Sequence, residues 1–245
     1  MVLSTDKGNC GLDLLGIING TETRKHIIIR SSCGIERFFT HDRHVREWLV
    51  DNGIIDTPKM HEVDIYHRLM QFLLVDAIHP RENIIEGVNA FKNSVHWDNY
   101  TIIGIHLRTG LLEGNVGWGR FIEEDDINYF LMQANRQSLN LKRHIPNKDV
   151  KWFVLADNEG VKSTVAKEAG DRFLTANCTI AHSKNRNANG MYCSFVENYL
   201  LSDCNFLILT YKSTFGYLAK HRTDVSQLNV LPGSWKKIKP KYLVC

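Results

Sequence analysis

The sequence lacks the features that mark several broad classes of protein. Of its 245 residues, 43% are hydrophobic and 23% are charged, which excludes collagen-like, coiled-coil and wholly disordered chains. The 30 basic and 27 acidic residues leave a net charge of only +3, which gives a nucleic-acid or membrane-surface role no support. No run reaches the roughly 18 to 20 apolar residues of a membrane span, and the first residues do not resemble a signal sequence. We therefore expect a soluble protein with a packed core.

Short catalytic and metal-binding motifs are also missing. The six cysteines form no C-x-x-C pair and no cluster with histidine, so we expect buried free thiols and no zinc site. The absence of G-x-G-x-x-G, G-x-x-x-x-G-K-[ST], G-x-S-x-G and H-E-x-x-H disfavours NAD-dependent dehydrogenases, P-loop enzymes, α/β-hydrolases and zincins. D-x-D is absent as well, which disfavours glycosyl transfer that depends on a metal.

What the sequence does have is strands alternating with helices. In the first half we expect strands at 2–4 and 25–30 around a helix at 12–18, then helices at 46–52, at 66–77 and after Pro80. After a polar break at 93–99 the alternation restarts, with strands at 101–107, 151–156, within 172–181 and at 205–210, and helices at 125–138, 159–169, 191–204 and 214–221. This predicts an α/β protein with parallel sheets in two domains, residues 1–98 and 99–245, whose ligands bind where strands end.

One such strand end carries His106 and Arg108, two residues apart and hence on the same face of the strand. A glycine-rich loop that begins near Gly110 follows. The fork of donors on arginine suits phosphate oxygens, and glycine allows the backbone to approach a ligand closely. The pair thus suits a diphosphate, while a satisfied core histidine beside a surface or salt-bridged arginine explains the pattern equally well.

Two further strand ends carry polar groups. Asp157 follows the strand at 151–156, where its carboxylate could accept from a sugar hydroxyl or cap the next helix. Ser213, Thr214 and Phe215 lie between a strand and a helix, where hydroxyl and backbone N–H groups form an anion site, although capping alone would also explain them.

Two more candidates come from a helix and a loop. Glu197 lies on a mostly apolar helix, so its carboxylate either faces solvent or turns inward to meet a donor such as the N1/N2 edge of guanine. His182 follows a strand, where loop residues of this architecture meet ligands, but a single histidine there is also typical of an exposed loop.

Taken in order, these segments resemble the superfamily of α1,2-, α1,6- and protein O-fucosyltransferases and xyloglucan fucosyltransferases. Its H-x-R strand end is matched by His106 and Arg108, and its strand ending in aspartate by Asp157. Its D-x-x-x-L-S-x-x-D helix is matched from Glu197 to Asn205, and its S-[ST]-F motif begins at Ser213. With the segment from Leu69 to Pro80, the resemblance covers residues 69–220; a short Gly-Asn turn at residues 8–9 also matches.

The resemblance implies roles for these residues. Arg108 would hold the β-phosphate and offset the charge that develops on the departing nucleotide, and His106 would contact phosphate or ribose. Glu197 would accept from guanine, although the family usually has aspartate there, and Asp157 would line the donor pocket. The remaining donor-binding residues would be His182, Ser213, Thr214 and Phe215, with Gly8 and Asn9 from the opposite domain.

The resemblance also implies the fold and the reaction. We expect a GT-B architecture of two facing Rossmann-like domains, the first on the acceptor side and the second binding the nucleotide sugar. The expected activity is inverting transfer of L-fucose from GDP-fucose to a hydroxyl of a glycan or protein, with no metal or other cofactor. Glu113 is a candidate general base, although a glutamate among glycines is also typical of a solvated loop. The alternative is a non-catalytic relative that binds a sugar nucleotide or glycan.

Two observations point to different cellular compartments. The resemblance implies the lumen of the Golgi or endoplasmic reticulum, whereas the lack of a recognisable signal or transmembrane segment leaves the cytoplasm open. The expected partners are a nucleotide-sugar donor and a glycan or glycoprotein acceptor, with no nucleic acid.

Overall fold

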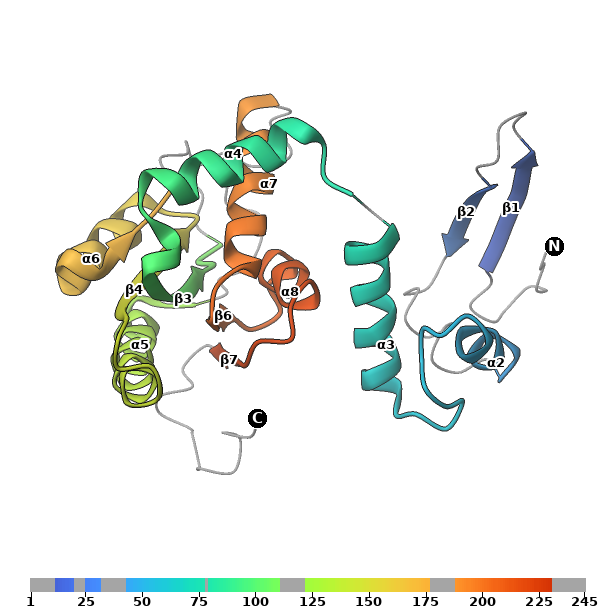
Figure 1. The fold of residues 1–245 in the computed structure, drawn as a ribbon, viewed down its shortest axis with the longest axis horizontal. Helices are drawn as coiled ribbons and strands as arrows, with labels where there is room; N and C mark the ends of the chain where they lie inside the picture. The colour runs from blue at the N-terminus through green and yellow to red at the C-terminus, as the bar shows by residue number, and fades with distance from the viewer. Residues whose placement is uncertain are drawn as a thin grey trace. The chain divides into compact units, whose positions relative to one another are not determined.

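A computed structural model describes residues 12–19, 25–31, 43–77, 79–110, 122–176 and 188–230. The chain divides into two compact units, residues 1–77 and 78–245, earlier than the boundary expected at 98/99. The reason is that α4 (Glu82–Ser94) packs on α7 (Ala188–Ser202), as Figure 1 shows. Ile84 and Val88 of α4 are buried in the same apolar cluster as Val196 of α7. The helix after Pro80 therefore belongs to the second unit.

The first unit contains an antiparallel pair of strands and two helices. β1 (Leu12–Asn19) pairs with β2 (Lys25–Ser31), and α2 (Arg43–Asp51) and α3 (Glu62–Gln71) follow, with α3 continuing into a π-helical segment, η1 (Phe72–Ala77). The helix expected at 12–18 is wrong, because Ile17 and Ile18 are β-branched and Gly16 weakens a helix, which favours pairing with β2. The parallel sheet expected for this half is thus not formed by these strands, and residues 2–4 lie outside the described residues.

The two helices of this unit share a small core. Leu49 of α2 and Ile65 of α3 are completely buried, and Leu69 lies one turn beyond Ile65 on the same face. The loop between the helices adds Ile54 and Ile55 to this cluster. Amphipathic spacing in the sequence thus predicts both helices, which the structure confirms.

The second unit contains a parallel sheet of five strands in the order β5-β4-β3-β6-β7. The strands are β3 (Tyr100–Leu107), β4 (Asp149–Ala156), β5 (Phe173–Leu174), β6 (Phe206–Thr210) and β7 (Gln227–Val230). Every pair in this sheet is parallel, which confirms the α/β prediction for this unit. β3 is buried along almost its whole length, because helices cover both faces of the sheet.

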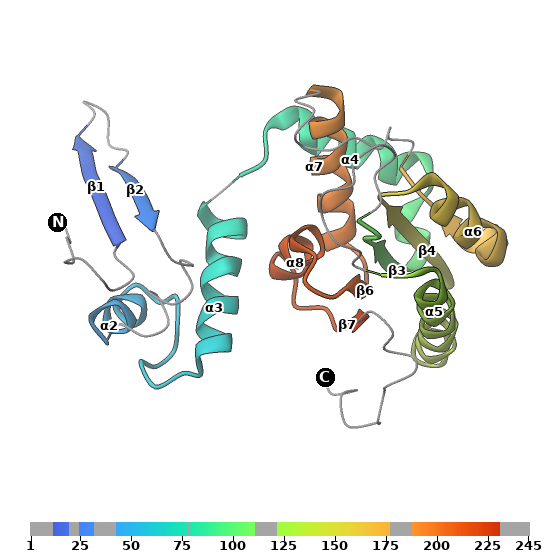
Figure 2. The same ribbon diagram turned by 180° about the vertical axis from the view of Figure 1, so that it is seen from behind.

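The helices form two groups, one on each face (Figures 1 and 2). α5 (Glu124–His144) and α6 (Glu159–Ala169) contribute to one apolar cluster, whereas α4, α7 and α8 (Thr214–His221) contribute to the other. α6 ends before Gly170, whose φ of 56° is a conformation that glycine adopts without steric cost. This stop, and the bounds of α8, agree with the sequence-based prediction.

The cysteines differ from one another. Cys204 is a buried free thiol, as expected, and burial raises its pKa well above the usual value. Cys193 is disulfide-bonded, so the expectation of free thiols is wrong for this residue. Cys204, the other cysteine among the described residues, is not its partner. Separately, none of the described helices combines the length and apolarity that crossing a membrane requires.

Candidate functional site

The carboxyl end of β3 places a buried histidine against the start of α8. His106 is 6% exposed, and its ring stacks on Phe215 with ring centroids 5.1 Å apart and an angle of 22° between the planes. A Cβ at Gly216 would lie 3.3 Å from His106 Nδ1, so glycine at this position lets helix and histidine approach closely. Within the part of the chain that the structure describes, His106 Nδ1 has no hydrogen-bond partner. Such an unpaired buried polar atom is costly in a folded protein.

His106 is neutral in this environment. Burial lowers its pKa to about 4, while the Asp157 carboxylate acts in the opposite direction and the Arg108 guanidinium adds to the lowering. A neutral imidazole can donate from one nitrogen and accept at the other. The side chain can therefore hydrogen-bond a ligand at neutral pH without bringing a charge.

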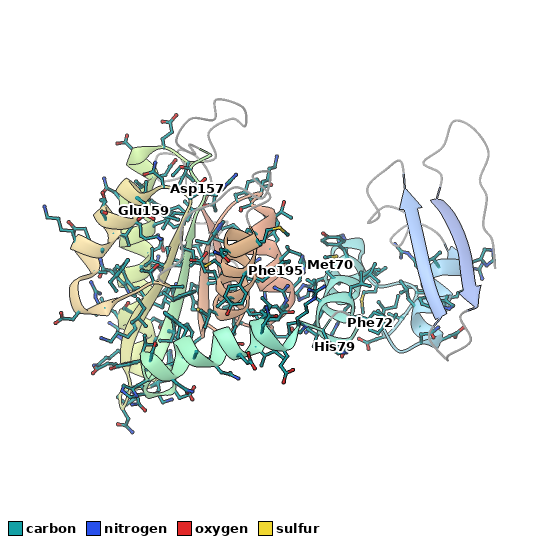
Figure 3. The ribbon with its side chains drawn as sticks, turned by 90° about the horizontal axis from the view of Figure 1, so that it is seen from above. Met70, Phe72, His79, Asp157, Glu159 and Phe195 are labelled. Atoms are coloured by element: carbon teal, nitrogen blue, oxygen red, sulfur yellow. The ribbon has the colours of Figure 1, made fainter. Side chains whose placement is uncertain are left out.

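Arg108 and Asp157 form an ion pair at this edge. Nη1 of Arg108 lies 3.0 Å from Oδ2 of Asp157, with 25% and 9% of the two side chains exposed. Asp157 does not cap α6, because the side chain of Asn158 accepts from the Val161 N–H and performs that role. Figure 3 shows Asp157 where β4 ends and Glu159 at the start of α6. The guanidinium is thus held near solvent at the point where ligands of parallel sheets bind.

The start of α8 has the geometry of an anion site. Ser213 occupies the N-cap position, yet its side chain makes no capping hydrogen bond, although the residue is 5% exposed. Lys212, just before it, has a φ of 61°, a left-handed conformation that a residue with a side chain adopts only at a cost. The exposed Thr214 follows. Backbone N–H groups at a helix start attract anions.

Glu197 is turned inward. Burial raises the pKa of its carboxyl group to about 7, with Lys162 opposing and Glu159 adding to the rise. Both neighbours lie on the first turns of α6, and Lys162 is itself buried, with its Nζ 3.5 Å from Glu159 Oε1. Of the two alternatives drawn from the sequence, the structure supports the inward-facing carboxylate.

Two residues that sequence reasoning missed connect these parts. Thr210, fully buried at the end of β6, donates from Oγ1 to the His106 carbonyl at 2.9 Å and accepts from the Arg108 N–H at 2.9 Å. Asn198, buried on α7, donates from Nδ2 to the Phe215 carbonyl at 2.7 Å and accepts from Arg222. A polar residue that ends an apolar strand, as Thr210 does, is the signal that could have indicated such a role.

The structure therefore brings together many, but not all, of the predicted site residues. His106, Arg108, Asp157, Ser213 and Phe215 meet around the ends of β3, β4 and β6, and Thr214 is at the start of α8. The residues Gly8, Asn9, Glu113 and His182 lie outside the described residues. Among the described residues, no group of three or more His, Cys, Asp or Glu side chains could hold a metal ion.

Asn205, which stands where the fucosyltransferase motif has aspartate, is at the other end of the sheet. Its Oδ1 accepts from the Ile102 N–H at 2.7 Å, and its own N–H donates to the Ile102 carbonyl at 2.8 Å. An aspartate would accept the same bond from the Ile102 N–H, so this departure from the motif leaves the backbone groups of Ile102 hydrogen-bonded.

These features describe a Rossmann-like α/β fold with an arginine and a helix start at the strand ends. A sequence profile of the nodulation protein Z (NodZ) family matches residues 28–224, most of the chain. The protein belongs to this family. The match confirms the relation to fucosyltransferases inferred from the motifs. No curated protein matches the chain.

Several solved fucosyltransferase structures are distantly similar to this chain. The α-1,6-fucosyltransferase NodZ co-crystallised with GDP is 19% identical, with a TM-score of 0.41, and the match covers 65% of this chain and 44% of NodZ. A mutant of Arabidopsis thaliana FUT1 in complex with GDP is 16% identical, with a TM-score of 0.46, and the match covers 76% of this chain and 40% of FUT1. POFUT1 with GDP is 11% identical, with a TM-score of 0.38 and coverage of 71% and 53%. The chain thus spans about half the length of these proteins, and the family assignment rests on the sequence profile.

Proposed function

We propose that the protein is a glycosyltransferase that transfers L-fucose from GDP-fucose to a hydroxyl of a glycan or protein. Membership of the NodZ family supports the class of reaction. The observation that carries the proposal is the position of Arg108, whose guanidinium is paired with Asp157 at 3.0 Å at the carboxyl end of the sheet, the end at which α8 also begins without a side-chain cap. Together these groups provide positive charge and N–H donors for a diphosphate.

The proposed reaction inverts the configuration at the anomeric carbon. The acceptor oxygen forms a bond to that carbon as its bond to the oxygen of the β-phosphate breaks, and the acceptor proton passes to a base, for which Glu113 is the candidate. Negative charge develops on the departing GDP, where Arg108 stabilises it and no metal ion is required. His106, being neutral, donates a hydrogen bond to phosphate or ribose, and Ser213, Thr214 and Phe215 supply hydroxyl and backbone donors.

The base is recognised by Glu197 in this proposal. Guanine carries two N–H donors on its N1/N2 edge, and an inward-facing carboxylate is a matching acceptor. Burial raises the pKa of Glu197 to about 7 and Lys162 opposes this rise, so the ionised form that accepts both hydrogen bonds prevails above about pH 7. Uridine and adenosine nucleotides offer no such pair of donors. The site should therefore prefer GDP to UDP and ADP.

Calorimetry of the purified chain with GDP, UDP and ADP tests the nucleotide site. We expect GDP to bind at least about tenfold more tightly than the other two, because each bond to a charged acceptor contributes roughly 1.5 to 3 kcal/mol. Equal affinities, or no binding, would refute the proposed donor.

Release of GDP from GDP-fucose, with and without EDTA, then tests turnover. Activity that survives the chelator supports transfer without a metal, and Glu113→Gln examines the base. GDP binding without any turnover or acceptor transfer, in a chain whose fold is intact, would favour the non-catalytic alternative.

We also propose that the protein works in an oxidising compartment such as the endoplasmic reticulum or Golgi lumen. The disulfide at Cys193 supports this, because disulfides persist mainly in secretory compartments. Mass spectrometry of protein alkylated without reduction should leave Cys193 unlabelled. Complete labelling of Cys193 in protein isolated from its native compartment would contradict the proposal.

A further inference from the structure

The loop that follows β3 is held by side chains from both neighbouring strands. Three successive N–H groups each donate to such a side chain: Arg108 to Thr210 Oγ1 at 2.9 Å, Thr109 to Asp157 Oδ1 at 2.8 Å, and Gly110 to Asp157 Oδ2 at 2.9 Å. Thr210 ends β6 and Asp157 follows β4, so the loop is clamped from the two strands that flank β3. These three N–H groups are therefore already hydrogen-bonded within the protein.

Asp157 is the centre of this network. Besides the two backbone donors, its Oδ1 accepts from Thr109 Oγ1 at 2.8 Å and its Oδ2 pairs with Arg108 Nη1 at 3.0 Å. Its two oxygens therefore receive four donors, while only 9% of the side chain is exposed. A carboxylate in this state has little capacity left for a ligand, and capping of α6 is done by Asn158.

We propose that Asp157 is a positioning residue that fixes the Arg108 guanidinium and its loop for the donor diphosphate, and that it does not bind the donor itself. This inference rests on the proposed function. The Asp157 carboxylate accepts from the backbone N–H groups of Thr109 and Gly110 and also pairs with the side chain of Arg108. The direction of the guanidinium is therefore set before the nucleotide arrives. Pre-orientation of this kind removes the need to order a long side chain during binding and catalysis.

A positioning role for Asp157 and a direct contact with the nucleoside predict different effects on nucleotide binding. GDP carries the β-phosphate that Arg108 is proposed to hold, whereas GMP lacks it. Loss of Asp157 should therefore weaken GDP binding while leaving GMP binding nearly intact. A carboxylate that accepted from the ribose would weaken both nucleotides, and one that only maintained the fold would weaken both together with thermal stability.

The experiment is calorimetry with GDP and GMP on four variants. In Asp157→Asn we expect GDP affinity to fall about tenfold or more while GMP affinity changes by less than about twofold. In the Arg108→Ala background, Asp157→Asn should cause no further loss, because its effect passes through the arginine. The matched control is Asp149→Asn, which removes an ion-paired aspartate at the opposite end of the same strand.

Three results would overturn the inference: equal weakening of GDP and GMP in Asp157→Asn, an additive loss in the double variant, or the same effect in Asp149→Asn. If Asp157→Asn does not fold, Thr109→Val removes one donor to the carboxylate and should lower the GDP-to-GMP affinity ratio in the same direction. No change in that ratio would also overturn it. A wild-type chain with no preference for GDP over UDP would instead refute the proposed function.

Discussion

The two ends of the parallel sheet satisfy their polar side chains in different ways. At the amino end, Lys142 bonds Asp149 at 2.6 Å, and Arg172 bonds the Asn135 side chain at 2.8 Å while stacking over Trp152. These basic side chains have partners within the protein, as Arg108 does at the carboxyl end. The carboxyl end also holds a buried imidazole nitrogen that none of the described residues bonds, a helix start without a side-chain cap, and Lys212 in the left-handed conformation.

A cavity of about 630 Å³ lies at the amino end, where α5 meets the first residues of β4. Among its lining residues, Lys151 donates to the Asp171 carbonyl at 2.5 Å, and Asn135 and Lys142 have the partners described above. Volume alone would direct attention to this cavity. An unpaired polar atom or a left-handed residue does not by itself mark a binding edge either, because Gln227 Oε1 at the start of β7 is also unpaired among the described residues and His96 before β3 has a φ of 53°. The proposed binding edge is distinguished by the combination of these features with the Arg108 guanidinium.

The largest expected effect comes from the arginine at the carboxyl end. Arg108→Ala should reduce turnover about 100- to 1,000-fold, the cost of losing one group that stabilises charge in the transition state. Arg108→Lys should recover only part of it, because lysine lacks the planar fork. Arg172→Ala at the amino end is the control in a steady-state assay of GDP release. Near wild-type turnover in Arg108→Ala would refute the proposal that the donor binds at the carboxyl end of the sheet.

A smaller effect is expected from Glu197. Its pKa is raised to about 7, so the neutral form is favoured in the folded protein without ligand. The associated stability is present below the usual pKa of 4.5 and is lost as pH rises through about 7. Glu197→Gln should therefore raise the melting temperature at pH 8 but not at pH 5. Glu159→Gln should lower the pH at which this stability is lost, because Glu159 contributes to the raised pKa of Glu197.

Binding should depend on pH in the opposite direction. An ionised Glu197 is needed to accept from guanine, so GDP affinity should strengthen between about pH 6 and 8. In Glu197→Gln we expect affinity at pH 8 to be about 10- to 100-fold weaker and nearly independent of pH. Calorimetry at several pH values measures both effects. A Gln variant that binds GDP as the wild type does would remove Glu197 from the base site.

Buried hydroxyls at the two ends provide a matched comparison of stability. Thr210→Val leaves the Arg108 N–H and the His106 carbonyl without their partner, and Ser138→Ala does the same to the buried Trp152 Nε1, which donates to Ser138 at 2.8 Å. Each change should cost about 1 to 3 kcal/mol in the free energy of unfolding. Only Thr210→Val should also weaken GDP binding. Equal effects on GDP in both variants would show that the two ends are not functionally distinct.

The smallest effect is expected from Lys142→Met in the amino-end cavity. The ion pair of Lys142 with Asp149 is exposed to solvent on both sides, and such pairs contribute little to stability. GDP affinity and turnover should stay at wild-type values, and the denaturation midpoint should change little. A marked loss of nucleotide binding would show that this cavity, and not the carboxyl end, is the ligand site.

Local sequence signals predicted much of the second unit. The helix at 159–169 and the helix at 214–221 are observed at the expected bounds, because a capping residue, a glycine stop and apolar spacing act over a few neighbouring residues. The segment at 12–18 shows the limit of such signals. Leu12, Leu15 and Ile18 have helical spacing, yet pairing with residues 25–31 makes the segment a strand.

The sequence by itself thus determined the α/β alternation, the order of the motifs and the residue types at the strand ends. Only the tertiary structure decided what each polar group does: Asp157 clamps the Arg108 loop and leaves the cap to Asn158, and burial raises the pKa of the Glu197 carboxyl group to about 7. The physical reason is that a side chain's partners come from segments far along the chain. Thr210 reaches Arg108 across 102 positions of sequence, and no pattern within one strand or helix specifies such a contact.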